Sequence, residues 1–240
     1  MAKTVALSRK VLYDEFDLSS DHNKVSLVLS QAAPDKTVYG STSMARAPGL
    51  KSFEVNHQGY YESGVGEIET VFNANLGTAG TILTLLPTGT EGEPAYSFQG
   101  VTLDYQWGGQ IGDMNAISGN TKGEGTLVVR GTLMVAGSKT TSGNGTARQL
   151  GAVSATQSLY GIIHCPVHAA AGSTITVKIQ SDTAEGFPSP TDVLSFTQLT
   201  DVGVQWATPI AGAITDEWWR VVWAVTGSPA ATIYVNAAIL

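Results

Sequence analysis

Most of this chain alternates between apolar and polar residues with the two-residue period of a β-strand. In the segment 53–58, Phe53, Val55 and His57 fall on one face and polar residues fall on the other. The segment 11–18 reads as short strands broken by turns. The strand pattern recurs in segments 25–30, 81–86, 96–98, 101–107, 127–135, 159–167, 175–179, 193–196, 219–225 and 233–239. The pattern predicts a mainly β protein.

One segment, residues 63–77, has a helical period instead. Its apolar residues recur every three or four positions, as Val65, Ile68, Phe72 and Leu76. Glutamates lie in the first turns and Gly77 follows the last apolar residue, as the helix dipole and the usual C-terminal cap favour. The sequence predicts one short helix here.

A long polar excursion, Thr37–Leu50, leads directly into the strand at 53–58. It is rich in Gly, Ser and Thr, and it closes with Ala47-Pro48-Gly49-Leu50. A polar loop held by a rigid sheet is more often used for contact than for packing. The residues expected to make this contact are Thr37, Val38, Tyr39, Ser41, Thr42, Met44, Arg46, Pro48 and Leu50.

A second polar segment, residues 139–146, divides the chain. All eight residues are polar or glycine, which is typical of a linker. The predicted organisation is therefore a first domain over 1–138, a linker over 139–146 and a second domain over 147–240. The short strands and frequent turns of the second domain favour a β-sandwich, either immunoglobulin-like or jelly-roll-like.

Composition and charge argue against several classes of protein. The net charge of −7 argues against a protein that grips nucleic acid through its phosphates. A single cysteine, Cys165, excludes an intrachain disulfide, and a reducing compartment suffices. Residues 1–10 contain no apolar core of signal-peptide length, and no apolar run approaches the roughly 18 residues of a membrane span.

No catalytic or metal-binding set is predicted, and no cofactor. On a strand, His164 and His168 share a face while Cys165 points away, and no further Cys pair or His cluster completes a zinc set. Glu67 and Glu69 diverge by roughly 200° on a helix. An enzyme built on a sandwich would need a converging polar site, which these spacings do not provide.

The tryptophans of the second domain leave an alternative open. Trp219 and Trp223 share a stripe with Val221 and are expected in the core, whereas Trp218 points the other way. An exposed aromatic ring can stack on sugars. Trp218 is therefore the candidate contact residue of a carbohydrate-binding or host-surface-binding virion module, and loss of glycan binding in Trp218→Ala would favour that function.

Four motifs in residues 11–135 resemble, in order, those of the major tail tube proteins of long-tailed bacteriophages. The first is the turn Asp14–Ser20, where Glu-Phe replaces the usual glycine-containing pair. The second is the loop that closes with Ala-Arg-Ala-Pro-Gly-Leu at Leu50. The others are the aromatic step Gly59–Glu62 before the helix and the turn Gly108–Asp113 after it. The C-terminal half is similar to the sandwich appendages of some tail proteins.

The resemblance implies a tail-tube β-barrel or sandwich, flanked by the short helix, that assembles as hexameric rings. The rings stack into a tube, the loop Thr37–Leu50 bridges adjacent rings, and the genome passes through the lumen at ejection. The implied partners are other copies of the chain, a tape measure protein, a tail terminator and double-stranded DNA in transit without tight binding. The implied location is the virion tail, assembled in the host cytoplasm, with no membrane partner.

Overall fold

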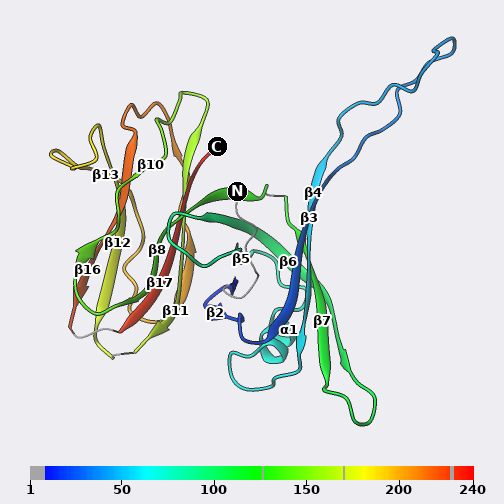
Figure 1. Ribbon diagram of the computed structural model, residues 1–240, viewed down its shortest axis with the longest axis horizontal. Helices are drawn as coiled ribbons and strands as arrows, with labels where there is room; N and C mark the ends of the chain where they lie inside the picture. Colours follow the sequence, from blue (N-terminus) through cyan, green and yellow to red (C-terminus); the bar gives the residue numbers. More distant parts are fainter. Residues whose placement is uncertain (1–8, 126, 170, 228–229) are drawn as a thin grey trace. The chain divides into compact units, whose positions relative to one another are not determined.

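The computed structural model describes residues 9–125, 127–169, 171–227 and 230–240, and within these ranges the chain is mainly β with one short helix (Figure 1). This confirms the predicted fold class. The expectation for the N-terminal segment falls mostly on residues 1–8, which lie outside the described ranges. None of the helical structure described is long and apolar enough to cross a membrane.

The chain forms two compact units. The arm unit comprises Ser20–Thr81 and Phe98–Val128, and the sandwich unit comprises the residues up to Ser19, Ile82–Ser97 and Val129–Leu240. These units divide the chain differently from the predicted boundary at 139–146, because the sandwich unit also takes strands from the first half of the sequence. Segments of that kind cannot be assigned to a unit from local pattern, since their partners lie far away in the sequence.

The arm unit is built on antiparallel strands in the order β3-β4-β7-β6, with one helix. Its elements are β3 (His22–Gln31), β4 (Lys51–Tyr60), α1 (Ile68–Asn75), β6 (Pro94–Gly108, of which residues 98–108 belong here) and β7 (Ala116–Gly123). The predicted two-sided strand at 53–58 is confirmed, because Phe53, Val55 and His57 are buried and the residues between them are less so.

The helix covers the buried face of this sheet. Ile68, Val71 and Phe72 are buried, while Val65 and Leu76, the first and last residues of the predicted stripe, are exposed. The helix begins at Ile68, three residues after Val65, so it is shorter than the predicted apolar stripe. The β4–β7 pair brings Gly119 under the Phe72 ring, where an added Cβ would lie 2.7 Å from a ring carbon. Glycine is thus required at this close approach.

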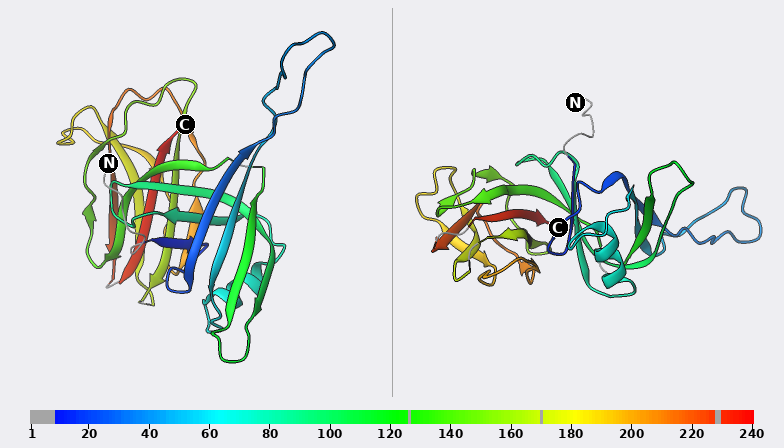
Figure 2. Two further views of the ribbon diagram at one scale, coloured as in Figure 1. Left: turned by 45° about the vertical axis from the view of Figure 1, so that its right-hand side comes forward. Right: turned by 90° about the horizontal axis from the view of Figure 1, so that it is seen from below.

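The sandwich unit has two packed sheets. One follows the order β14-β11-β17-β8-β6-β5-β1-β2 with β15 beside β11, and the other follows β10-β16-β12-β13 with β9 beside β16. Their bounds are β1 (Lys10–Tyr13), β2 (Phe16–Asp17), β5 (Thr81–Leu86), β8 (Val129–Lys139), β9 (Gly143–Asn144), β10 (Arg148–Gln149), β11 (Ser158–His168), β12 (Thr174–Asp182), β13 (Thr191–Ser195), β14 (Gly203–Trp206), β15 (Ile210–Ala211), β16 (Trp218–Thr226) and β17 (Ala231–Ile239). Figure 2 gives two further views of these strands.

The core between the two sheets is apolar and continuous. It contains Met134 and Val135 of β8, Ile163 of β11, Ile179 of β12 and Trp219 of β16, with many neighbours from the same strands. Strand β8 comes before the predicted linker in the sequence, yet its side chains belong to this core. Burial of such side chains contributes roughly 1.5–3 kcal/mol each, so β8 is an integral part of the sandwich.

Two local predictions differ from the structure. The segment 139–146 packs on the second sheet: β9 pairs with Val222 and Trp223, and Gly145 N–H donates to the Val221 carbonyl at 2.7 Å. The alternation expected over 101–107 is interrupted in β6 by a register shift between Thr102 and Asp104, so Thr102 is buried and Leu103 is exposed. A β-bulge of this kind reverses which side chains face the core.

Candidate functional site

The loop predicted to make contacts forms a long arm that continues β3 and β4. Its backbone pairs with itself: Ala32 N–H donates to the Leu50 carbonyl at 2.9 Å, and Lys36 N–H donates to the Ala45 carbonyl at 2.8 Å. Asp35 and Arg46 form an isolated antiparallel bridge between these pairs. The arm projects from its unit in every view (Figures 1 and 2). The backbone of the arm is therefore hydrogen-bonded across its two sides within a single chain.

The tip of the arm is held by side chains of its own. The Thr37 backbone N–H and hydroxyl both donate to the Asp35 carboxylate, and Ala45 N–H donates to the Thr37 hydroxyl at 2.9 Å. The hydrogen bonds from Thr37 lower the pKa of Asp35. These hydrogen bonds hold the two sides of the arm together next to its tip.

Apolar side chains at the tip are exposed. Tyr39 is fully exposed, and Val38 and Met44 are 72% and 65% exposed. Leu50, at the base, is also exposed. Of the nine residues predicted for this contact, all lie on the arm and all are exposed, namely Thr37, Val38, Tyr39, Ser41, Thr42, Met44, Arg46, Pro48 and Leu50. Large apolar side chains presented together on a projection are typical of an interaction site.

The outer face of the sheet in the arm unit is polar. The register pairs Lys24 with Gln58, Glu54 with Lys122, and Asn120 with Asp104, so these side chains share one face. The Asn120 amide donates to the Glu54 carboxylate at 2.5 Å and to the Asn56 amide oxygen at 3.0 Å. The two lysines and two carboxylates among these residues balance, so the face carries no net positive charge.

The inner face holds a buried polar cluster beneath α1. The His22 Nε2 and His57 Nδ1 atoms lie 3.0 Å apart, and the His57 ring packs edge-on to Phe72 with centroids 5.1 Å apart. The Thr121 hydroxyl lies 3.3 Å from His57 Nε2. Burial, with a smaller effect of the His22 charge, holds the pKa of His57 well below its usual value. His57 is therefore neutral at physiological pH and serves the fold.

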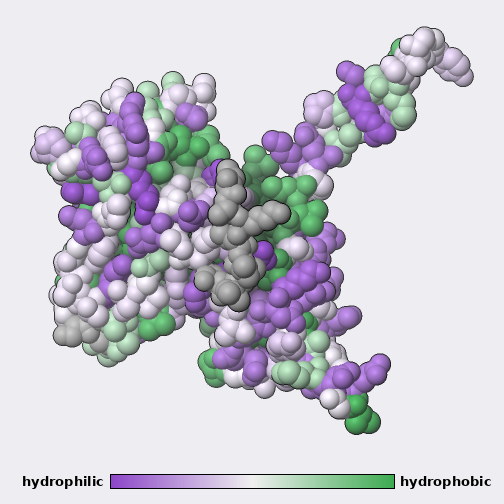
Figure 3. All heavy atoms as spheres, viewed as in Figure 1, coloured by the Kyte–Doolittle hydropathy of each residue, from purple (hydrophilic) through white to green (hydrophobic). Residues whose placement is uncertain are grey.

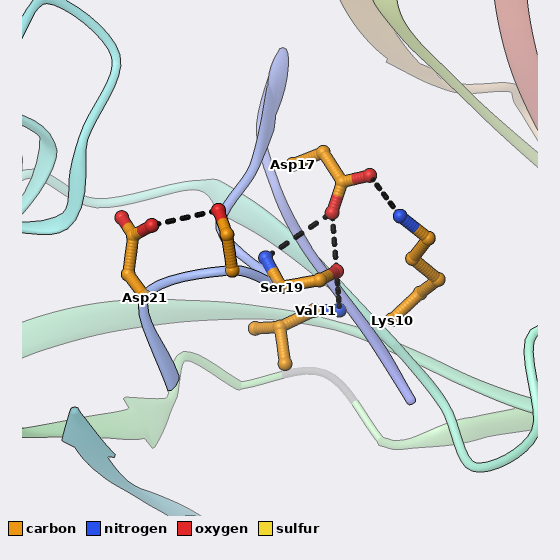
Figure 4. Close-up of polar contacts among 6 residues, drawn as sticks. Lys10, Val11, Asp17, Ser19 and Asp21 are labelled. Atoms are coloured by element: carbon orange, nitrogen blue, oxygen red, sulfur yellow. Dashed lines mark hydrogen bonds and ion pairs between the residues drawn. The ribbon is translucent and has the colours of Figure 1, made fainter. Parts of the chain in front are cut away.

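Residues 10–19 form a hydrogen-bonded hairpin (Figure 4). The Lys10 ammonium donates to the Asp17 carboxylate at 2.7 Å, and the Ser19 hydroxyl donates to the other carboxylate oxygen. Val11 N–H in turn donates to the Ser19 hydroxyl at 3.0 Å. The motif Asp14–Ser20 noted in the sequence thus closes the β1–β2 hairpin.

The histidine and cysteine run of β11 is structural. His164 Nδ1 donates to the Asp14 carbonyl at 2.7 Å, and its Nε2 accepts from the Thr84 hydroxyl at 2.8 Å. Cys165 is buried, and burial raises the pKa of its thiol to about 11, which leaves little reactive thiolate. In the described part of the chain no group of three His, Cys, Asp or Glu side chains is placed to hold a metal ion.

The tryptophans follow the predicted alternation along β16. Trp219 is fully buried, and its indole N–H donates to the Gly151 carbonyl at 2.8 Å. Trp223 is only partly buried and packs against the edge of the same core, so the core expectation is confirmed for Trp219 and holds only in part for Trp223. Trp218 points the other way and is half-buried at the point where β16 pairs with Gln149.

One residue important for the arm unit was not found from the sequence. Asp21 is 3% exposed, and its carboxylate accepts the backbone N–H of Ile68 at 2.8 Å. It therefore caps α1 from 47 residues away. Capping residues are recognised in sequence by adjacency to the helix, which this one lacks.

No protein-family model matches this chain, and no curated protein sequence matches it. Its structure is similar to a solved structure titled "Virion of native gene transfer agent (GTA) particle", with 10% identity, a TM-score of 0.41, and coverage of 52% of this chain and 97% of that one.

Two further solved structures are similar. One is the SPP1 Dit (gp 19.1) protein, described as a hub adsorption apparatus in Gram-positive infecting phages, with 14% identity, a TM-score of 0.40, and coverage of 97% of this chain and 99% of that one. The other is titled as the tail of an empty GTA particle with C6 symmetry, with 11% identity, a TM-score of 0.38, and coverage of 49% and 92%. All three TM-scores are below 0.5, and all three identities are below 25%.

Proposed function

We propose that this chain is a structural protein of a phage-like tail, in which copies form hexameric rings that stack into a tube and the arm bridges adjacent rings. The observation that carries the proposal is the arm itself. It is a self-paired projection with exposed Val38, Tyr39 and Met44 at its tip, and a second copy would cover these side chains. The sequence resemblance to tail tube proteins includes this segment.

The polar face of the sheet suits the wall of a conduit. Lys24 and Lys122 are balanced by Glu54 and Asp104, so the face offers DNA phosphates no net attraction. Phosphate neutralisation by Lys and Arg supplies most non-specific affinity for DNA. We therefore assign this face to the lumen, where a polar, charge-balanced wall would let DNA pass without adhering.

The structural role also accounts for the chemistry of the described residues. The buried His57 and His164 are committed to internal hydrogen bonds, and the Cys165 thiol is protonated at neutral pH. These side chains stabilise the fold, and none presents a nucleophile or base to solvent. The proposal therefore includes no enzymatic activity and no cofactor.

Electron microscopy of the purified full chain tests the proposal. Six-fold rings and tubes are expected from the wild type. Replacing residues 37–44 by Asn-Gly, which joins Lys36 to Ala45 through a two-residue hairpin turn, should leave the circular dichroism spectrum and unfolding unchanged and prevent stacking. Val65→Asp is the matched control, because Val65 is fully exposed but lies outside the arm.

The outcomes separate the parts of the proposal. Tubes from the shortened chain would show that the arm does not bridge rings. Discrete rings that never stack, even in the wild type, would place the chain at the end of a tail rather than along it. A wild-type chain that stays monomeric at high concentration would overturn the proposed function.

A further inference from the structure

A groove lies at the base of the arm, where β3 ends and β4 begins. It encloses about 380 Å³ and is lined by Leu29, Lys51, Phe53, Leu127 and their neighbours. The side chains of Leu29 and Leu127 at its rim are 60% and 59% exposed, whereas Phe53 is buried. Lys51 is the one charged residue among the described lining residues. This surface is called the arm-base groove below.

The opposite end of the same sheet carries an apolar projection. The connection between β6 and β7, residues 109–115, is called the tip turn. Asp113 N–H donates to the Gln110 carbonyl at 3.0 Å, and Gly112 has a φ of +98°, a conformation in which glycine is favoured. This turn leaves Ile111 fully exposed and Met114 68% exposed, with Asp113 between them. Figure 3 shows hydrophobic residues at this tip and at the base of the arm.

The strand register fixes the two surfaces at opposite ends. Tyr60, the last residue of β4, pairs with Ala116, the first residue of β7 after the tip turn. Lys51, the first residue of β4, pairs with Gln31 at the base of the arm. Each surface therefore faces away from the other along the strand direction. A contact between them requires two copies of the chain.

We propose that the tip turn of one copy inserts into the arm-base groove of the next copy, with Ile111 and Met114 against Leu29, Phe53 and Leu127. The proposal rests on the proposed function, since it describes a contact between copies stacked along the strands. Apolar side chains on the turn match an apolar groove, and the Asp113 carboxylate matches Lys51. The contact joins different surfaces of the two copies, so it repeats from copy to copy and propagates a stack.

Charge variants test the pairing. Asp113→Lys and Lys51→Glu should each weaken assembly of the full chain, raising the concentration at which tubes appear in sedimentation by about tenfold or more. An equimolar mixture of the two variants should restore assembly at least in part, because each contact between unlike copies again pairs opposite charges. The double variant D113K/K51E should return the threshold to within about threefold of the wild type. A double variant no better than the singles would overturn the Lys51–Asp113 pairing.

Cysteine cross-linking tests the contact itself. Mild oxidation should link Ile111→Cys to Leu29→Cys when the two variants are mixed, and should give little product with either alone. The native Cys165 is buried and contributes little background. Val65→Cys mixed with Leu29→Cys is the matched control, since Val65 is exposed on the same unit.

The results distinguish failure of this contact from failure of the proposed function. Tubes without the specific cross-link would retain the proposed function and overturn the contact. The cross-link without rings or tubes would retain the contact and overturn the proposed function. A result with neither tubes nor the cross-link would overturn both. Equal cross-linking in the Val65 control would show random collision and overturn the contact.

Discussion

At the residue scale, a chain of buried hydrogen bonds links segments far apart in the sandwich unit. Asn236 donates to the Ser97 hydroxyl at 2.9 Å, the Ser97 and Thr84 hydroxyls lie 2.7 Å apart, and Thr84 donates to His164. His164 then donates to the Asp14 carbonyl. The neutral imidazole, protonated on Nδ1, satisfies both neighbours. Burial accordingly lowers the pKa of His164 to about 4, although the bond to Asp14 acts in the other direction.

His164 and Asp14 affect the pH dependence of stability with opposite signs. Because the folded pKa of His164 is below its unfolded value of 6.5, its contribution is present above pH 6.5 and is lost as the pH falls towards 4. Burial raises the pKa of the Asp14 carboxyl to about 6 from 3.8. The folded state therefore loses stability from Asp14 as the pH rises through 6, and regains it on acidification.

The variant Asp14→Asn separates these two effects. It removes a partly buried charge, and asparagine tolerates the positive φ of 49° at this position and can still accept the Ile82 N–H. The free energy of unfolding at pH 7 should rise by about 1–3 kcal/mol. It should also fall more steeply between pH 6 and 4, because the loss from His164 is no longer offset.

Urea denaturation at pH 7, 5 and 4 measures this prediction. Asp113→Asn is the control, since that carboxylate is exposed on a turn, and it should change neither the stability nor its pH dependence. An Asp14→Asn chain no more stable than the wild type at pH 7 would contradict the account of Asp14.

Asp21 gives a second prediction at this scale. Asp21→Ala leaves the buried N–H of Ile68 without its carboxylate, so the free energy of unfolding of the arm unit should fall by roughly 1–2 kcal/mol. Glu69→Ala removes a less buried carboxylate from the first turn of the same helix and should cost only a few tenths of a kcal/mol. Chemical denaturation followed by circular dichroism compares the two, and equal costs would reject the capping role.

At the element scale, the arm is a hairpin extension with a firm stem and an exposed tip. The stem amides of Ala32, Lys36, Ala47 and Gly49 all donate to carbonyls of the opposite segment. From polar composition alone, a segment with so little to bury is expected to become ordered only when rings stack. The cross-arm hydrogen bonds instead give the stem an ordered backbone in the single chain.

Hydrogen exchange should therefore divide the arm into two parts. In the unassembled chain, the stem amides should exchange more slowly than those of the tip, residues 38–44, because only the stem is paired across the arm. On assembly the tip should become protected as a neighbouring copy covers it. Tip exchange that is the same in monomer and tube would show that the tip stays uncovered.

At the scale of the whole molecule, the sandwich core decides where the chain can be cut. A chain ending at Gly137 keeps most of β8 but loses β11, β12, β16 and β17, which supply most of the core around Met134 and Val135. Those side chains would be exposed, so this chain should be insoluble or should bind a hydrophobic dye strongly. A soluble product with cooperative unfolding would show that residues 147–240 are a separate domain after all.

Charge gives the second prediction at this scale. The chain has three basic and six acidic residues from position 141 onward, and ten and fourteen before it, so neither half is basic. Gel-shift titration at physiological salt should show negligible binding of duplex DNA. The variant D104K/Q106K makes the polar sheet face positive and should introduce binding that weakens as salt rises. Micromolar, salt-sensitive binding by the wild type would contradict a sliding conduit.

The sequence by itself determined the elements whose evidence is local. The alternation at Phe53, Val55 and His57 indicates a strand with one buried face. The spacing of Ile68 and Phe72 indicates a helix with one buried face. Strands and helix were therefore predicted at nearly the right places. The arm was also predictable, because a long polar segment between two strands has little to bury on its own.

Only the tertiary structure decided which strands share a core and which polar residues meet. Three contacts show this: β8 pairs with β17, Asp21 caps the helix at Ile68, and Asp14 contacts His164. The last two join residues that are 47 and 150 positions apart. Likewise, the bulge that buries Thr102 depends on registration against β7. Such features arise from packing between segments far apart in the sequence, and a local pattern does not specify which distant segment will be the partner.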